Sequence, residues 1–360
     1  MKHFGWFVTV VLMVLVGVQC SPGAESQTTS PMQPQDSGDP IADLDTSTVE
    51  AGRPIASPVP IDTFPRSTPL AIYPCYPVAF QRDNPFAFIP LCEAYRWSEH
   101  PDSQAVADRY LGMVEYENDN YHTLDSPYRK RFLKRCQMDD ADQVFVYNLD
   151  LDSIATYTVA ELSVVAFVTP YGTQGQVRQE DYLLGFQLEA AAMASWSYER
   201  SLVYVGRQNP FLKGQMKPIV WQVSKENPFS RFTFPKEDSS RIYKKDVAAT
   251  LYHEQEGKHY YLNNLGSNTS IGGRHLAVLD SARQQLIFSH AFIDSEGCDL
   301  NPLSGIDTAY KGQPMQFTGQ LFNNRPPVIM GFMSWSFGCP RIHFLAQESP
   351  PVFIRCDNRH

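Results

Sequence analysis

Hydrophobic and polar positions divide the chain into stretches of different character, and the first is a short apolar run. From Phe4 to Val18 almost every residue is apolar, and Lys2 places one firm positive charge before the run. As a helix it would rise roughly 22 Å, too short for a hydrocarbon core of about 30 Å. The charged start and the run length are typical of a secretion signal, so we expect residues 1–20 to direct export.

A polar stretch follows the apolar run. Residues 21–69 are rich in Ser, Thr, Pro, Gln, Gly and Asp, and Phe64 is their only aromatic residue. Such a segment buries too little apolar surface to offset the chain entropy lost on folding. We therefore predict a disordered spacer over residues 21–69.

Helical signals are few in the remaining chain. Pro101-Asp102-Ser103 indicates a helix start, because an apolar stripe with Val106 and Tyr110 follows it. Ser126 and Pro127 indicate a second helix, with Ser126 as the cap and Pro127 in the first helical position. Residues 187–197 are interpreted as a further helix.

Strand signals dominate instead. Residues 73–91 are rich in proline and aromatic residues, and we interpret them as irregular. Residues 276–280 and 285–290 predict a hairpin, and the chain from His259 onward has a strand pattern. Further predicted strands are 144–149, 155–157, 164–168, 202–205, 219–223 and 231–234.

These elements predict an α+β fold that is mostly antiparallel β with a few helices. Residues 70–250 would form an α+β domain and 251–360 a β-rich C-terminal part, which is either a second domain or part of the first. An aromatic content of 12% fits a β-rich globular body. The net charge of −9 argues against nucleic acid as a partner.

The cysteine count bears on the compartment. Of seven cysteines, Cys20 ends the apolar leader and six remain, an even number that favours disulfides in an exported protein. Cys75 with Cys92 would be the simplest local closure, but the connectivity stays open. The disulfide candidates are Cys75, Cys92, Cys136, Cys298, Cys339 and Cys356.

The end of the leader resembles a known processing signal. Val16-Gly17-Val18-Gln19-Cys20 is similar to the lipobox of bacterial lipoproteins, with Gln19 where that pattern has Gly, Ala or Ser. The resemblance implies that Cys20 is lipidated and tethers the protein to the outer membrane or the cell surface. The alternative is cleavage after Cys20, which would leave the protein freely secreted.

One segment near the C-terminus resembles a catalytic motif. Ser336-Phe337-Gly338-Cys339-Pro340-Arg341 is similar to the Ser-x-Gly-Cys-x-Arg nucleophile segment of L,D-transpeptidases, which cross-link peptidoglycan. The resemblance implies that Cys339 attacks a peptide carbonyl and that Arg341 holds a carboxylate, with Ser336 beside them. No His lies between Gln320 and Trp335, so His290 or His343 would have to activate the thiol. The competing interpretation makes Cys339 half of a disulfide with Cys298 or Cys356.

Metal and cofactor signals are weak. His253-Glu254 opens like a metalloprotease motif, but Gly257 stands where the second His is needed. We predict neither a metal site nor a cofactor.

Two function classes remain. The first is a membrane-tethered envelope lipoprotein that acts as a binding or structural module toward a cell-wall, surface-glycan or protein ligand. The alternative is a cysteine-dependent cell-wall acyl-transferase or peptidase that uses Cys339.

Overall fold

Extended segments pair into five antiparallel sheets in the part of the chain that the structure describes. This computed structural model describes residues 69–78, 86–97, 103–112, 121–169, 176–189, 200–236, 246–267, 269–307 and 312–358. All of them belong to Pro60–His360, which forms one compact unit. The predicted signal, Cys20 and nearly all of the predicted spacer lie outside the described residues.

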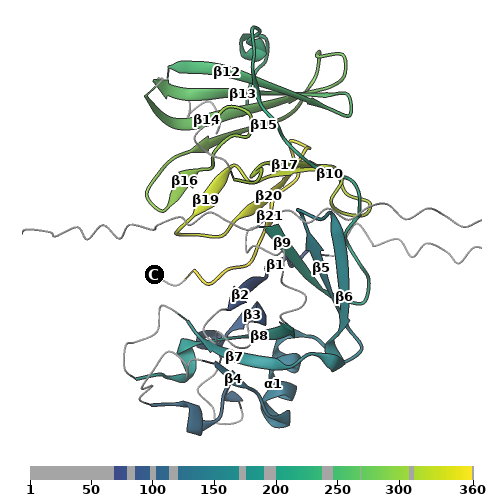
Figure 1. Cartoon of the computed structure of the whole chain (residues 1–360), viewed down its shortest axis with the longest axis vertical. Coiled ribbons are helices and arrows are strands. Elements are labelled where there is room, and N and C mark those ends of the chain that lie inside the picture. Colours follow the sequence, from purple (N-terminus) through teal and green to yellow (C-terminus); the bar gives the residue numbers. More distant parts are fainter. Residues whose placement is uncertain are drawn as a thin grey trace, which may run out of the picture. The chain divides into compact units, whose positions relative to one another are not determined.

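The first sheet has the strand order β2-β3-β8-β7-β4 and carries the helix α1 (Figure 1). Phe132 of α1 packs in the same core as Phe186 of β8, with the two rings edge to face and their centroids 5.6 Å apart. The bounds are Tyr76–Val78 (β2), Phe86–Glu93 (β3), Tyr182–Glu189 (β8), Val164–Val168 (β7), Tyr121–Thr123 (β4) and Ser126–Cys136 (α1).

The second sheet has the order β1-β9-β5-β6 and is apolar on both faces. Because strand side chains alternate, Val144 and Val146 of β5 face the core of the first sheet, whereas Phe145 and Tyr147 face a second core. The bounds are Tyr73–Pro74 (β1), Ser201–Gly206 (β9), Gln143–Asn148 (β5) and Ser153–Thr158 (β6).

The third sheet has the order β10-β17-β18-β20-β21 and covers that second core. Val328 of β18 and Phe344 of β20 pack there with Phe145 and Tyr147. The bounds are Met216–Pro218 (β10), Phe317–Gly319 (β17), Val328–Met330 (β18), Arg341–Phe344 (β20) and Val352–Phe353 (β21).

The fourth sheet has the order β11-β12-β13-β14-β15, and a two-stranded pair β16-β19 accompanies it. Ile329 of β18 shares a third core with Leu276 and Val278 of β14. The bounds are Gln222–Val223 (β11), Val247–Gln255 (β12), Lys258–Ser267 (β13), Ser270–Leu279 (β14), Leu286–Ile293 (β15), Cys298–Leu300 (β16) and Met333–Trp335 (β19).

The shared cores join the sheets in series, each to the next. The predicted boundary at residue 250 falls inside β12, and β10 pairs with β17 across it. A mostly antiparallel β fold was predicted and is confirmed, but helices are fewer than expected. The described helical segments besides α1 include the 3₁₀ turns Ala94–Arg96, Asp108–Tyr110, Val159–Glu161, Gln179–Asp181 and Pro228–Arg231.

The helix predictions succeed once. α1 begins at Ser126, one residue before the expected first helical position at Pro127, and Asp125 rather than Ser126 is its N-cap. The helix predicted after Ser103 is wrong over residues 103–112, because the Gln179 side chain binds the backbone there. Its Oε1 accepts from the amides of Ala105 and Val106 at 2.9 and 3.0 Å, so these groups need no helical partners.

Two further predictions are wrong, one of a helix and one of an irregular segment, because pairing with neighbouring strands determines the local structure there. Residues 187–189, expected to be helical, belong to β8, which is hydrogen-bonded on both sides by β3 and β7. Residues 73–91, expected to be irregular, contain β1, β2 and the start of β3. Pro90 is accommodated because the β3–β8 register shifts between Pro90 and Cys92.

The strand predicted over residues 231–234 is also wrong. Pro228 begins a 3₁₀ turn, and the Asn227 side chain caps it by accepting from the Phe229 amide at 3.2 Å. Among the described residues, no helix has both the length and the apolar character required to cross a bilayer.

Candidate functional site

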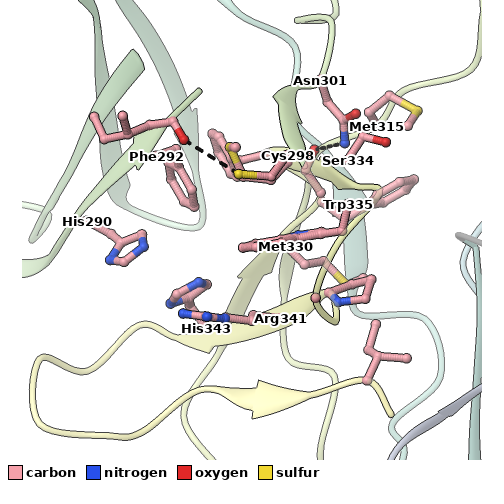
Figure 2. Close-up of a pocket in the computed structure, with 18 of the residues that line it drawn as sticks. His290, Phe292, Cys298, Asn301, Met315, Met330, Ser334, Trp335, Arg341 and His343 are labelled. Atoms are coloured by element: carbon pink, nitrogen blue, oxygen red, sulfur yellow. Dashed lines mark hydrogen bonds between the residues drawn. The ribbon is translucent and has the colours of Figure 1, made fainter. Parts of the chain in front are cut away.

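A cavity of about 340 Å³ lies where β15, the β16–β19 pair and β20 approach one another (Figure 2). Its walls are mostly apolar, with Phe292, Met330 and Trp335 among them, and none of the described lining residues is Asp or Glu. A mostly apolar pocket with a few convergent polar groups is the usual form of a small-molecule site. The polar lining residues are Arg200, His290, Ser295, Asn301, Ser334, Arg341 and His343.

Strand alternation places two of these polar groups on one wall. Ile342 and Phe344 of β20 face the second core, so Arg341 and His343 face the opposite side. There His343 meets β15, with its ring centroid 4.4 Å from that of His290 and 5.9 Å from that of Phe292. Figure 2 shows His290, His343 and Arg341 near one another on this wall.

Arg341 brings a positive charge to the edge of the cavity. Its guanidinium carbon lies 5.3 Å from the centre of the Trp335 ring and 4.9 Å from that of Phe353, both within cation–π range. Within the described chain Arg341 forms no ion pair, whereas Arg200 is paired with Asp150 and donates to the Pro314 carbonyl. The guanidinium of Arg341 is therefore oriented by aromatic rings without neutralisation by a carboxylate.

His343 is held neutral by its surroundings. Burial, together with the nearby His290 and Arg341, lowers the pKa of His343 to about 3. At neutral pH its imidazole is uncharged and can donate or accept a hydrogen bond.

Cys298 forms part of the other wall. It lies opposite Trp335 in the β16–β19 pair, and its Sγ is 3.0 Å from the Ser295 hydroxyl. Gly297, with φ of 81°, makes the turn before it, and an added Cβ there would lie 2.2 Å from the Phe337 ring. The Gly297 carbonyl accepts from the amides of Ser336 and Phe337, both at 2.9 Å, and so fixes the bend after β19.

The residues predicted as a catalytic group are only partly brought together. His290 and Arg341 line the cavity, but Cys339 and Ser336 are not among its described lining residues. Cys339 is bonded to Cys356, with 5.5 Å between their Cα atoms, and in this state it has no thiolate. A catalytic role for Cys339 would require the reduced protein, and it stays a prediction.

The disulfide with Cys356 is one of the two pairings considered for Cys339. Cys75, Cys92, Cys136 and Cys298 are free thiols, so the local closure of Cys75 with Cys92 is not formed. Cys92 instead hydrogen-bonds with Cys136 at the end of α1 and accepts from the Trp97 indole at 3.1 Å.

Sequence reasoning missed most of the cavity wall. Trp335, Met330 and Cys298 were not expected to gather, because their strands come together only through long-range pairing. A usable signal was the spacing of Arg341 and His343, which places both side chains on one face of a strand.

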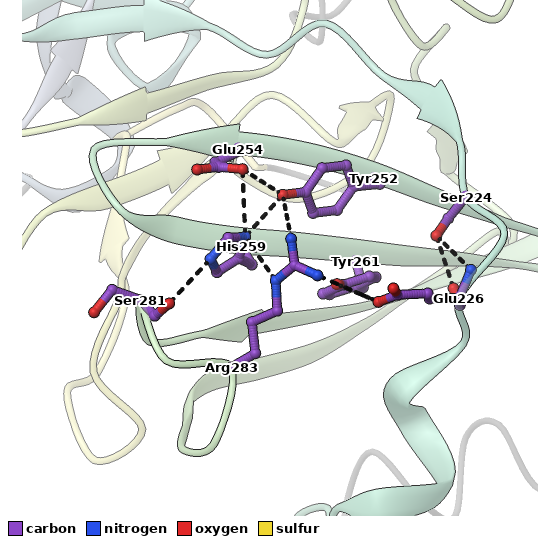
Figure 3. A network of polar contacts seen from close by, with 8 residues as sticks. All are labelled: Ser224, Glu226, Tyr252, Glu254, His259, Tyr261, Ser281 and Arg283. Atoms are coloured by element: carbon purple, nitrogen blue, oxygen red, sulfur yellow. Dashed lines mark hydrogen bonds and ion pairs between the residues drawn. The ribbon is translucent and has the colours of Figure 1, made fainter.

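A second polar cluster lies on the fourth sheet (Figure 3). The Tyr252 hydroxyl is 2.6 Å from Glu254 Oε2 and 2.8 Å from Nδ1 of the buried His259, and Arg283 Nε donates to the same Nδ1 at 3.3 Å. Burial and the adjacent Glu254 raise the pKa of Tyr252 to about 12. Since its groups bond to one another, this cluster joins the β12–β13 hairpin to the loop at Arg283.

Within the described residues, no group of three or more His, Cys, Asp or Glu side chains is placed to hold a metal. No protein-family model matches the chain, and comparisons with curated proteins and with solved structures found no match either.

Proposed function

We propose that the protein is an exported, lipid-anchored envelope protein that acts as a binding module, with the cavity beside β15 and β20 as its ligand site. The cavity is the observation that carries the proposal. At about 340 Å³ it falls within the usual range for small-molecule pockets, roughly 300–1,000 Å³. Its lining offers aromatic and sulfur-containing surface for an apolar ligand body.

The proposed location in the cell envelope rests on the N-terminal sequence. The apolar run, Cys20 and the polar residues after it support export and lipidation, and the Cys339–Cys356 disulfide suits an oxidising compartment. Mass spectrometry of the mature N-terminus tests this part. We expect a chain that begins at a diacylated or triacylated Cys20, and an unmodified Ser21 at the N-terminus would contradict the tether.

The binding role is tested by blocking the cavity. Ser334 lines it, so Ser334→Trp should occupy the space and abolish uptake of an environment-sensitive apolar dye. Ser281→Trp is the matched control, because Ser281 lies exposed on the β14–β15 hairpin outside the cavity lining. Equal dye uptake by wild type and Ser334→Trp would contradict the proposal.

The cysteine-enzyme alternative needs a free thiol at residue 339. Thiol counting on the untreated protein distinguishes the two functions. Four free thiols, counted after unfolding without reductant and with Cys339 unlabelled, fit the binding module. Rapid labelling of Cys339 at neutral pH would favour the enzyme.

A further inference from the structure

We infer that the ligand of this cavity is a small monocarboxylate with an apolar body, whose carboxylate is held by Arg341 beside His343. This inference rests on the proposed binding function and specifies the chemistry of its ligand.

The sign of the ligand charge follows from the charges on the walls. Every charged side chain in the described lining is an arginine, and the charge of Arg200 is offset by Asp150. Of these two lining arginines, Arg341 forms no ion pair with a described residue. A cationic ligand would meet no carboxylate here, whereas an anion would neutralise the Arg341 guanidinium.

The number of charges on the ligand follows from the same charged lining residues. One unpaired guanidinium matches one negative charge, which favours a carboxylate over a phosphate monoester of charge near −2. The planar guanidinium can bind both carboxylate oxygens with two parallel hydrogen bonds. Trp335 and Phe353 already orient this group, so less side-chain entropy is lost when it binds.

His343 supplies a second polar contact. Its partly buried imidazole lies next to Arg341 and, being neutral, can donate an N–H to a ligand oxygen. The aromatic ring of Phe292 and the side chains of Met330 and Cys298 then surround the rest of the ligand. The carboxylate and the apolar body thus meet different walls of one cavity.

The volume sets the size of the ligand. One water molecule in the liquid occupies about 30 Å³. A cavity of about 340 Å³ therefore has room for roughly eleven groups of that size. This fits a ligand of about ten non-hydrogen atoms. Suitable probes are 3-phenylpropanoate for an aromatic body and octanoate for an aliphatic one.

The test compares three phenyl ligands whose head groups differ in charge, with octanoate as a second, aliphatic carboxylate. Calorimetric titration of the full mature protein at pH 7 would use 3-phenylpropanoate, octanoate, the neutral 3-phenylpropanamide and the cationic 3-phenylpropylamine. We expect at least one carboxylate to bind about tenfold more tightly than the amide, the scale of one hydrogen bond to a charged group. The amine should bind least.

Variants assign this preference to one residue. Arg341→Gln should remove the advantage of the carboxylate and leave the amide affinity within about twofold, while Arg341→Lys should restore part of it. Arg355→Gln is the matched control, because Arg355 also lies over an aromatic ring, that of Tyr73, yet is outside this cavity.

The outcomes separate the two proposals. If acid and amide bind equally to the wild-type protein, or the amine binds best, the monocarboxylate assignment is overturned and the binding module stands. If Arg341→Gln keeps the full acid preference, the assignment to Arg341 is overturned. If no probe binds and the apolar dye is excluded as well, the binding function itself fails.

Discussion

At the scale of single residues, side chains act through groups that the sequence leaves far apart. The Asn-Pro-Phe tripeptides show what local sequence does determine. In the two described copies, Asn209 and Asn227 each accept from the amide two residues later, and Phe211 and Phe229 are buried, so the asparagine forms a turn and the phenylalanine anchors it in a core.

His343 should make stability depend on pH. Its pKa is about 3 in the fold and about 6.5 in the unfolded chain, so between these values only the unfolded state binds the proton. This contribution is complete above pH 6.5 and falls with pH by at most about 1.4 kcal/mol per unit. Urea unfolding from pH 7 to pH 4 should therefore show a steeper loss for wild type than for His343→Gln. Parallel profiles for the two proteins would contradict an imidazole that the fold keeps neutral.

Cys92 should be the most reactive of the free thiols near α1. The hydrogen bond from Cys136 and the Trp97 indole lower the pKa of Cys92 to about 7 against the effect of burial, whereas burial raises that of Cys75 to about 12. The rate of alkylation by iodoacetamide, followed by peptide mass spectrometry, should rise through about pH 7 for Cys92 and stay far lower for Cys75. In Cys136→Ala the midpoint for Cys92 should move upward. An unchanged midpoint would show that Cys136 does not set this pKa.

At the scale of elements, prediction succeeded where the pattern was local and strong. The short apolar strand at Val164–Val168 and the β14–β15 hairpin match the structure, and α1 begins within one residue of its expected start. It failed where a distant partner satisfied the backbone, as Gln179 does for Ala105 and Val106. The candidate site was predicted only in part. His290 and Arg341 were named as catalytic candidates, but the cavity that they line forms only when strands distant in the sequence pair with one another.

The disulfide should stabilise the C-terminal strands without serving the ligand site. Cys339 precedes β20 and Cys356 follows β21, with a sequence separation of 17 residues. Replacing both by serine should lower the free energy of unfolding by roughly 3 kcal/mol, the usual scale for a loop of this length. Dye binding at a temperature where the variant is still folded should persist. If the double-serine variant is as stable as wild type but no longer binds the dye, the two cysteines contribute directly to ligand binding.

At the scale of the whole described unit, three shared cores connect four sheets in series. Ile72 of the N-terminal part and Ile354 near the C-terminus lie in the same core and form a parallel bridge, so the second core is built from both ends of the described unit. The proposed ligand cavity draws on both parts of the chain, since Leu149 and Arg200 line it together with His343.

Unfolding should therefore be a single cooperative transition. Val146→Ala removes side-chain volume from the first core and Val278→Ala from the third, each at a cost of roughly 2 kcal/mol. In both variants, circular dichroism and tryptophan fluorescence should report one common midpoint, shifted from that of wild type. Two separate midpoints, with each variant moving only one, would show that the parts on either side of residue 250 are independent domains.

The central claim, that this cavity binds an apolar carboxylate, is tested most directly by protection of Cys298. Its sulfur lies in the cavity wall, and the other free thiols, Cys75, Cys92 and Cys136, are not among the described lining residues. Saturating 3-phenylpropanoate or octanoate should slow alkylation of Cys298 at least tenfold and leave Cys92 unaffected. Alkylation of Cys298 at an unchanged rate, under conditions where calorimetry shows the same carboxylate bound, would place the ligand elsewhere and contradict the account.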